Sequence, residues 1–359
     1  MLSEISLVNF KSFRDKTLSI LPMTLLAGLN NSGKSSVIQA LRMLWKWILR
    51  GWPTLYDHGE LIDMKNINVD TAEPIKISCK IKNGQTFEMT INFTDTLQPR
   101  INSFEQNQPQ LPFLSYLSAD RWGPRVYQPM YNAAIELSHI GKHVGRYGEY
   151  VIDFLSSHEN DIVPQRLCHP NTEGETLLFN VRAWLKEISP YVTFKHSTDK
   201  KRDIAYAEIN DFRPPNTGFG LSYTLPVIVS LLGMAAQWED SEGQMLKDAN
   251  GVLVLLENPE AHLHPKAQTS IGRLIALAAA SGVQVIVETH SEHVMDGIRI
   301  AVKDKELPSD MATFHYFSLD KERNTIVETP KIYPNGKLDF WPKGFFDQPM
   351  HNSARLAKR

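Results

Sequence analysis

Residues 28–35 have the types and spacing of a phosphate-binding loop, G-x-x-x-x-G-K-[ST], without a mismatch. The glycines let backbone N–H groups close around phosphate oxygens, Lys34 places its amine against the β- and γ-phosphates, and the hydroxyl of Ser35 binds Mg²⁺. A simple turn between a strand and a helix is the alternative, and the elements around the loop argue against it. The residues expected to bind the phosphates are Asn30, Asn31, Ser32, Gly33, Lys34, Ser35 and Ser36.

A strand and a helix must hold this loop in place. The apolar residues 23–27 precede it and predict a buried strand. Residues 34–50 carry apolar side chains at helical spacing, and Gly51 with Pro53 ends the predicted helix. Because the amino end of a helix carries partial positive charge, this helix would point that end at the phosphates.

Acidic and histidine side chains follow two further buried strands. Glu257 comes directly after the apolar run 252–256, and His290 follows the run 283–288. In open α/β sheets the carboxyl ends of parallel strands face the ligand crevice. We therefore expect Glu257 to bind Mg²⁺ together with Ser35, and His290 to hydrogen-bond a γ-phosphate or the attacking water.

Strands that alternate with helices predict an α/β fold with a mainly parallel sheet covered on both faces. Segments 74–81 and 86–93 alternate around Asn83 and Gly84, which predicts a hairpin in a small inserted β lobe. Further helices are expected over 176–189, 222–236 and 265–280, and an exposed loop over 96–112. The predicted parts are an N-terminal half of the core with the β lobe (1–115), a mostly helical lobe (116–215) and a C-terminal half of the core (216–359).

The composition predicts a folded cytoplasmic protein without a membrane-spanning segment. Charged residues make up 22% and hydrophobic residues 42% of the chain, and no apolar run reaches the about 18 residues that span a bilayer. Cys79 and Cys168 lie far apart, which fits a reducing compartment. A net charge of −2 gives no bulk attraction to nucleic acid, and local basic residues are either DNA contacts or solvated loops. These basic residues lie at 142–146, Arg182, Lys186, Lys195 and 200–202.

In their order along the chain, these motifs resemble those of ABC-class ATPases of the SMC, RecF and OLD branch, and more closely a compact subgroup from bacterial defence operons that includes the Septu-type ATPase. The resemblance covers the ATPase core at both ends of the chain, and residues 120–215 have no counterpart in it. It implies a P-loop NTPase with the fold of an ABC-type head, which binds ATP and Mg²⁺ and forms a homodimer by sandwiching two ATP molecules. The resemblance rests on residues 9–13, 28–36, 218–222, 257–265, 289–291 and 341–347.

The resemblance also assigns roles to individual residues. Glu257 becomes the Walker B acid and His290 the switch histidine. Lys11 and Arg14 would lie near the base or the phosphates of the nucleotide. The site would be completed in trans, by a second copy of the chain.

Residues 218–222 correspond to the signature turn, in which Gly220 and Ser222 would contact the γ-phosphate across the dimer. The turn departs from the transporter pattern because Tyr223, instead of a glycine pair, follows Ser222. The alternative is that Ser222 only caps the helix over 222–236.

Asn258 is a second departure from the family pattern. In the family's best hydrolases this position holds the catalytic glutamate, and an amide cannot accept a proton from water. Glu260 is the candidate for a substitute base, and capping the helix that begins near Pro265 is its alternative role. We therefore expect a slow ATPase with Glu257, Glu260 and His290 at its catalytic centre.

The expected function is that of an ATP-dependent switch. The resemblance implies that the closed homodimer gates a separate effector protein, for which a nuclease is one candidate, in antiviral defence. No acidic cluster of the Toprim type follows residue 300, so the chain itself is not expected to cut nucleic acid. The alternatives are a nucleotide-controlled scaffold with negligible hydrolysis and a RecF-like ATPase of DNA repair.

Some residues have competing interpretations. The histidines at 262, 264, 290 and 293 could bind a metal ion, but their spacing and the lack of a further ligand motif favour polar packing. Asp120 and Arg121 would reach a nucleotide or a partner, or form a surface salt bridge, which we favour. The aromatic tail either folds back onto the sheet, which we favour, or docks a partner. Its aromatic residues are Phe340, Trp341, Phe345 and Phe346.

Overall fold

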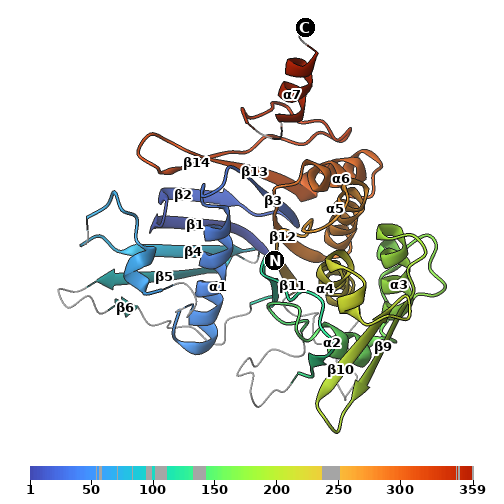
Figure 1. Cartoon of the computed structure of the whole chain (residues 1–359). Coiled ribbons are helices and arrows are strands. Elements are labelled where there is room, and N and C mark those ends of the chain that lie inside the picture. Colours follow the sequence, from blue (N-terminus) through green and yellow to red (C-terminus); the bar gives the residue numbers. More distant parts are fainter. Residues whose placement is uncertain are drawn as a thin grey trace. The chain divides into compact units, whose positions relative to one another are not determined.

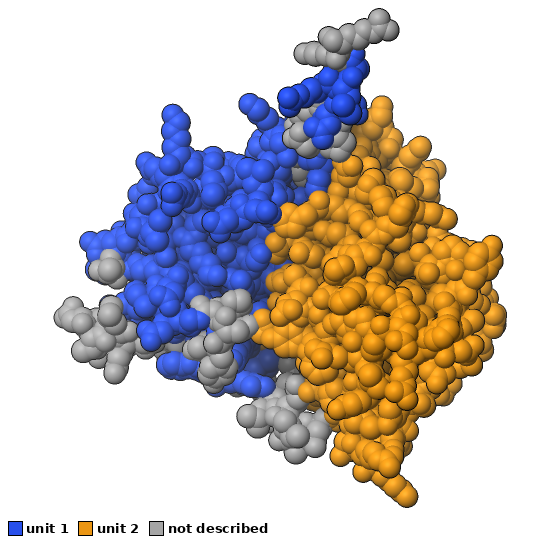
Figure 2. Space-filling model, viewed as in Figure 1, with its two compact units in different colours: residues 1–110, 313–331, 338–359 blue, residues 111–312, 332–337 orange. Residues whose placement is uncertain are grey.

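The computed structural model describes residues 1–357 except 54, 56–58, 71, 83, 94–98, 102–110, 132–142, 237–250, 345 and 347. The chain, whose elements are labelled in Figure 1, forms two compact units, which Figure 2 shows in blue and orange. Unit 1 comprises residues 1–110, 313–331 and 338–359, and unit 2 comprises residues 111–312 and 332–337. Asn83 and most of the loop predicted over 96–112 lie outside the described residues. Within the described part of the chain, no helix is long and apolar enough to cross a membrane.

Unit 1 contains an antiparallel sheet with the strand order β2-β1-β4-β5-β6. Its strands tend to alternate buried and exposed side chains, and in β1 the side chains of Leu2, Ile5 and Leu7 are fully buried. β4 and β5 pair as the predicted hairpin, with Gly84 in the left-handed region at φ 89°. The strands are β1 (Leu2–Phe10), β2 (Phe13–Ser19), β4 (Ile75–Ile81), β5 (Thr86–Phe93) and β6 (Pro99–Ile101).

A second strand group of unit 1 leads into the phosphate-binding segment. β3 (Met23–Gly28) is followed by α1 (Lys34–Arg50), which confirms the predicted strand and helix. α1 packs against β3, β4 and β5, and Gly51 ends it with a left-handed φ of 72°. The remaining elements of this unit are β13 (Ala312–Leu319), β14 (Thr325–Glu328) and α7 (Gln348–Leu356).

Unit 2 is built on parallel strands in the order β12-β11-β7. Every residue of β12 is buried, as are the apolar residues of β11, which explains their continuous apolar runs. In Figure 1, α4 packs against β11, and α5 packs against β12 and α6. α4 begins at Phe219 and not at the predicted Ser222, whereas α5 has its predicted bounds. The elements are β7 (Phe113–Leu117), β11 (Val252–Glu257), β12 (Val283–Glu288), α4 (Phe219–Ala235), α5 (Pro265–Ala280) and α6 (Glu292–Lys303).

The segment predicted as a mostly helical lobe contains strands as well as helices. α2 (Val151–His158) is followed by α3 (Leu177–Ile188), which confirms the helix predicted over 176–189. The sequence pattern does not predict the antiparallel sheet β8-β10-β9, because β8 is very short and β9 is mostly polar. The division of the chain at residues 115 and 215 stays a prediction. The strands are β8 (Gln128–Pro129), β9 (Phe194–Asp199) and β10 (Ile204–Ile209), and the short 3₁₀ helices are Leu61–Met64, Gln165–Leu167, Pro214–Asn216 and Ser309–Met311.

Candidate functional site

The phosphate loop, residues 28–35, joins β3 to α1 in unit 1. Both of its glycines hold conformations that side chains rarely adopt, with φ of 140° at Gly28 and 104° at Gly33, the N-cap of α1. A β-carbon at Gly28 would collide with the backbone carbonyl of Phe317, and one at Gly33 would lie 2.7 Å from Oγ1 of Thr325. The turn therefore requires glycine at both positions.

Lys34 and Ser32 stabilise the phosphate loop by hydrogen bonds to backbone carbonyls of the same loop. The Nζ of Lys34 donates to the carbonyl oxygens of Gly28 at 3.1 Å and Leu29 at 2.7 Å, and only 4% of the residue is exposed. The Ser32 hydroxyl donates to the Leu29 carbonyl at 2.6 Å, and the Thr325 hydroxyl donates to the Ser32 carbonyl at 2.9 Å. The ammonium group is thus held on neutral carbonyls, from which a charged phosphate oxygen can attract it.

The other predicted phosphate ligands lie on the rim of the loop and in the first turn of α1. Asn30 and Asn31 are exposed, and Asn31 has a left-handed φ of 60°. Ser35 is half-buried and Ser36 is buried. The structure therefore leaves the two asparagines and Ser35 accessible to a ligand and places Ser36 against the unit's interior.

Lys11 and Arg14 differ in their surroundings. Lys11 follows β1 with a φ of 51°, and its Nζ donates to Oε1 of Gln39 on α1. Burial lowers the pKa of the Lys11 amine. Arg14 is exposed on β2. The structure brings Lys11 to the helix that begins in the phosphate loop and leaves Arg14 facing solvent.

The acidic residues lie in unit 2, at the carboxyl ends of β11 and β12. Glu257 and Glu288 are register partners in this parallel pair, so their side chains point to the same face of the sheet. The backbone turns at Asn258, whose φ is 45° and whose N–H donates to the Glu288 carbonyl at 2.9 Å. Residues 257–262, which contain this turn, are named the acid loop.

The Glu257 carboxylate is held in place from the side of β7. Its Oε1 accepts from the Tyr116 hydroxyl at 3.2 Å, and its Oε2 accepts from the Ala119 N–H at 3.1 Å. Tyr116 is the register partner of Leu255 on β11, so it reaches Glu257 from the neighbouring strand. These contacts orient a carboxylate of the kind that binds Mg²⁺ directly or through water.

Glu260 and His290 are joined by a hydrogen bond that the sequence does not predict. Oε1 of Glu260 accepts from the His290 N–H at 2.8 Å, while the His290 residue as a whole is exposed. Burial raises the pKa of Glu260, and this hydrogen bond and the charge of Arg121 oppose the rise. α5 begins at Pro265 with His264 as its N-cap, so the alternative in which Glu260 caps this helix is wrong.

Arg121 is buried, so the favoured interpretation as a surface salt bridge is wrong. Only 2% of the residue is exposed. Its Nη1 donates to the carbonyls of Ser118 at 2.9 Å and Glu257 at 2.7 Å, and its Nη2 donates to the carbonyl of Asn258 at 2.6 Å. Burial lowers the pKa of Arg121 to about 10, which still leaves it charged at neutral pH. The guanidinium carbon lies 5.5 Å from the centre of the Tyr223 ring on α4.

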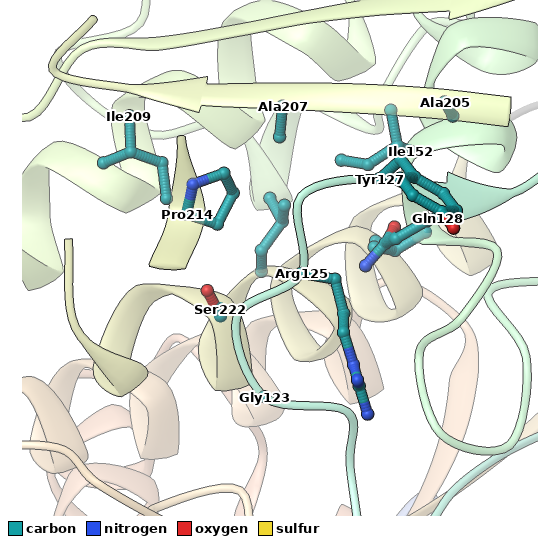
Figure 3. A pocket seen from close by; sticks show the side chains of 12 residues that line it. Gly123, Arg125, Tyr127, Gln128, Ile152, Ala205, Ala207, Ile209, Pro214 and Ser222 are labelled. Carbon is teal, nitrogen blue, oxygen red and sulfur yellow. The ribbon is translucent and has the colours of Figure 1, made fainter. Parts of the chain in front are cut away.

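The signature turn, residues 218–222, begins α4. Gly218, with φ 86°, is the N-cap, so the interpretation of Ser222 as the cap is wrong. The Ser222 hydroxyl is buried and has no hydrogen-bond partner among the residues that the structure describes. It points toward Pro214 in a small hollow of unit 2 (Figure 3). Contact between this hydroxyl and a phosphate would therefore require the first turn of α4 to move.

The first turn of α4 packs closely on the acid loop. A β-carbon at Gly220 would lie 3.1 Å from the His262 carbonyl. The ring of His262 contacts the Tyr223 ring edge-on at 4.6 Å between centroids and lies 5.6 Å from the Phe219 ring. His262 thus packs among aromatic rings, and His264 caps α5. Across the described ranges, no group of three histidine, cysteine or acidic side chains could hold a metal ion.

Some of the basic residues considered for DNA contact are paired with acids. The Nζ of Lys195 lies 2.6 Å from Oδ1 of Asp211, and Nη1 of Arg202 lies 2.6 Å from Oδ2 of Asp199. Lys142 lies outside the described residues. The neighbouring acids reduce the positive charge offered to DNA phosphates. DNA contact stays a prediction.

Two aromatic residues of the tail are partly exposed. Phe340 is 44% and Trp341 is 43% exposed, and Phe345 lies outside the described residues. Folding back onto the sheet and docking of a partner both stay predictions for this tail.

Three family models match the chain. Residues 1–215 match the model of the AAA ATPase domain, and residues 179–296 match a second model of an AAA domain. Residues 307–356 match a model described as a protein of unknown function, DUF3696.

Two curated relatives are OLD nucleases. The chain is 20% identical over 343 residues to the Old nuclease of Escherichia phage P2, a match that covers 82% of this chain and 57% of that protein. It is 22% identical over 352 residues to the OLD nuclease of Thermus scotoductus, covering 85% of this chain and 63% of that protein. The chain thus spans less than two thirds of the length of either relative.

Solved structures of SMC head domains share the fold. An SMC head bound to the C-terminal winged-helix domain of ScpA has a TM-score of 0.54 at 13% identity, over 92% of this chain and 97% of that chain. A Pyrococcus furiosus SMC head with an extended coiled coil, bound to the C-terminal domain of ScpA, has a TM-score of 0.53 at 12% identity, over 99% of each chain. This likeness confirms the predicted fold class, an α/β P-loop head of the ABC type.

Proposed function

This chain belongs to the AAA ATPase domain family as an ABC-type ATPase of the SMC, RecF and OLD branch, and on that premise we propose that it binds ATP with Mg²⁺, dimerises around the nucleotide and hydrolyses it slowly. The phosphate loop carries the proposal. Its glycines at 28 and 33 cannot be replaced without a clash, and the buried amine of Lys34 is held over the loop. These features support phosphate binding by the loop amides and by Lys34.

Ser35 and Glu257 are the proposed ligands of Mg²⁺. Bound Mg²⁺ would neutralise charge that develops on phosphate oxygens during hydrolysis. Ser35 lies in the accessible first turn of α1, and the hydrogen bonds from Tyr116 and Ala119 hold the Glu257 carboxylate in one orientation. A hydroxyl and a carboxylate are oxygen donors of the type that this ion prefers.

Glu260 is the proposed general base. The amide of Asn258 cannot accept a proton, whereas burial raises the pKa of Glu260 toward the range in which a carboxylate accepts one efficiently. The hydrogen bond from the His290 N–H orients this carboxylate beside the proposed switch histidine. Slow turnover is expected because Glu260 lies two residues beyond the usual position of the base.

The proposed dimer places the signature turn, with Gly220, against the nucleotide of a second copy. Gly218 leaves the amino end of α4 without a side-chain cap, and Phe219 beside it is 55% exposed. An uncapped helix amino end attracts anions. Ser222 would join the phosphate contact only if the first turn of α4 shifts.

The proposed setting is a cytoplasmic defence system in which ATP-driven closure controls a separate effector, with a nuclease as one candidate. Support comes from the resemblance to compact defence ATPases and from relatives that are nucleases. The alternative of a nucleotide-controlled scaffold is favoured by one observation, the amide at Asn258.

Steady-state phosphate release and light scattering with and without ATP test this proposal. We expect slow release that Lys34→Ala removes, and a mass that doubles with ATP in the Glu260→Gln variant. Release from the wild type equal to the Lys34→Ala blank would refute hydrolysis and favour the scaffold. A mass that stays monomeric with ATP in every variant would refute the sandwich. Added duplex DNA that stimulates release would favour the RecF-like alternative.

A further inference from the structure

We propose that Arg121 is a positioning residue for hydrolysis, which fixes the first two residues of the acid loop and keeps the Glu260 carboxylate charged and ready to accept a proton. The inference rests on the proposed function, in which Glu260 is the base. The motifs that carry the family resemblance do not include Arg121, and its exposure of only 2% rules out a surface role.

The guanidinium of Arg121 donates hydrogen bonds to three backbone carbonyls. Two belong to Glu257 and Asn258, and the third belongs to Ser118, directly after β7. One of the bonds reaches the acid loop at Asn258, whose φ of 45° is one of two left-handed values in this loop. A planar guanidinium can donate to several carbonyls in fixed directions, and a lysine amine cannot reproduce that fork. Arg121 therefore sets where the acid loop leaves the sheet.

The same cation balances the charge around Glu260. The charged and titratable groups around this pair are Glu257 at the end of β11, Tyr223 on α4 and His290 after β12. Glu257 favours the charged form of Arg121, and His290 contributes its backbone N–H to Glu260. Arg121 and Glu260 each favour the other's charged form. Removing the cation would leave the Glu260 carboxylate, whose Oε2 is buried, without this opposite charge, and protonation would become more favourable.

Aromatic rings shield this cation from water. The Tyr223 ring lies over the guanidinium, and the His262 ring packs edge-on against Tyr223. Coulomb interactions are stronger where water is excluded, so the charge of Arg121 acts on Glu260 with less screening than an exposed arginine would. A purely structural arginine would leave the titration of Glu260 unchanged, which makes that titration the decisive measurement.

The test uses the full chain labelled with ¹³C-glutamate and follows the Glu260 carboxyl by NMR, assigned by its loss in Glu260→Gln. We expect Arg121→Gln to raise the pKa of Glu260 by about one unit or more, because an opposite charge at short range shifts a carboxyl by roughly that amount. Arg125→Gln is the matched control, since Arg125 is exposed and stacks on Trp122 at 5.2 Å. An unchanged Glu260 titration in a folded Arg121→Gln variant overturns the proposal.

Arg121→Lys keeps the positive charge and so tests the positioning role separately. It also serves as the test if the Arg121→Gln variant does not fold. We expect the Glu260 titration to stay near that of the wild type, and the amides of residues 257–262 to exchange hydrogen faster. Phosphate release should fall about tenfold in kcat at an unchanged KM for ATP, as expected for a residue that positions the base. Unchanged exchange in the acid loop overturns the proposal. Because titration and exchange need no turnover, an inactive wild type would refute the proposed hydrolysis, while the two measurements would still decide whether Arg121 fixes the acid loop and the charge of Glu260.

Discussion

The phosphate loop and the acid loop differ in which parts of the chain supply the hydrogen bonds that stabilise them. The phosphate loop is continuous in sequence, and its bonds from Lys34 and Ser32 close within residues 28–34. The acid loop, residues 257–262, is held by segments far away in the chain, through Arg121 and through the backbone of His290. The phosphate loop thus takes most of its side-chain hydrogen bonds from within, with further bonds from Thr325 and to the Phe317 carbonyl, whereas the acid loop depends mainly on distant segments.

This difference predicts how the two regions respond to substitution. Where the support is local, one residue carries a large share of the function and its removal is severe. Where several distant side chains share the support, each removal has a smaller effect and the losses are not additive. Substitutions in both loops test this difference, and they are given from the largest expected effect to the smallest.

Lys34→Ala should have the largest effect. It removes the cation that the phosphate loop holds on its own carbonyls, and a lost charged donor at a phosphoryl group costs about 100- to 1,000-fold in turnover. Phosphate release together with titration of a fluorescent ATP analogue measures the loss. Lys200→Ala, an exposed lysine of unit 2, is the control and should match the wild type. A loss below tenfold for Lys34→Ala would end the claim that this loop concentrates its function in one residue.

Gly28→Ala should destabilise the protein by at least about 3 kcal/mol. The new β-carbon would meet the backbone of Phe317, which cannot move aside as a flexible side chain can. Gly51→Ala is a matched control, because Gly51 also has a positive φ, 72°, but nothing lies within 4 Å of its β-carbon position. It should cost only about 1 kcal/mol of backbone strain. Urea unfolding separates the two, and equal losses would show that strain alone, and not the close approach, requires glycine at position 28.

Glu260→Gln should lower turnover about 100-fold, the usual contribution of a general base. The amide can still accept the hydrogen bond from the His290 N–H, so the acid loop keeps its shape and ATP binding should be unchanged. Single-turnover phosphate release measures the effect. Turnover equal to that of the wild type would remove Glu260 from the catalytic centre.

The raised pKa of Glu260 gives a second signature, which depends on pH. Between the ordinary pKa of glutamate and the raised folded value, the folded chain binds more protons than the unfolded chain, so folding stability rises as the pH falls through the folded pKa. Turnover changes in the opposite direction, because the protonated carboxyl is no longer a base. Unfolding curves and phosphate release, both measured from pH 7 to pH 5, should show the two trends in the wild type. Glu260→Gln should lack the contribution of this carboxyl group to folding stability.

The sequence predicts elements formed by consecutive residues and misses contacts between residues that lie far apart in the chain. The phosphate loop, α1 and α5 are predicted with their bounds, because glycine spacing and apolar periodicity are local signals. The bond from His290 to Glu260 joins residues 30 positions apart in sequence, which no spacing rule covers. Arg121 is misread for a similar reason: an isolated arginine is usually exposed, and the converging carbonyls of Ser118, Glu257 and Asn258 help to make its burial tolerable.

Tyr116→Phe should have the smallest effect and tests the distributed support most directly. The change removes one hydrogen bond to Oε1 of Glu257 and keeps the ring, while the Ala119 N–H still holds Oε2. A single hydrogen bond contributes about 1 kcal/mol, so turnover should fall about fivefold with ATP affinity unchanged. Tyr191→Phe, at a residue that is 96% exposed, is the control and should have no effect. If Tyr116→Phe were as damaging as Lys34→Ala, the acid loop would depend on one side chain after all, and the contrast between the two loops would fail.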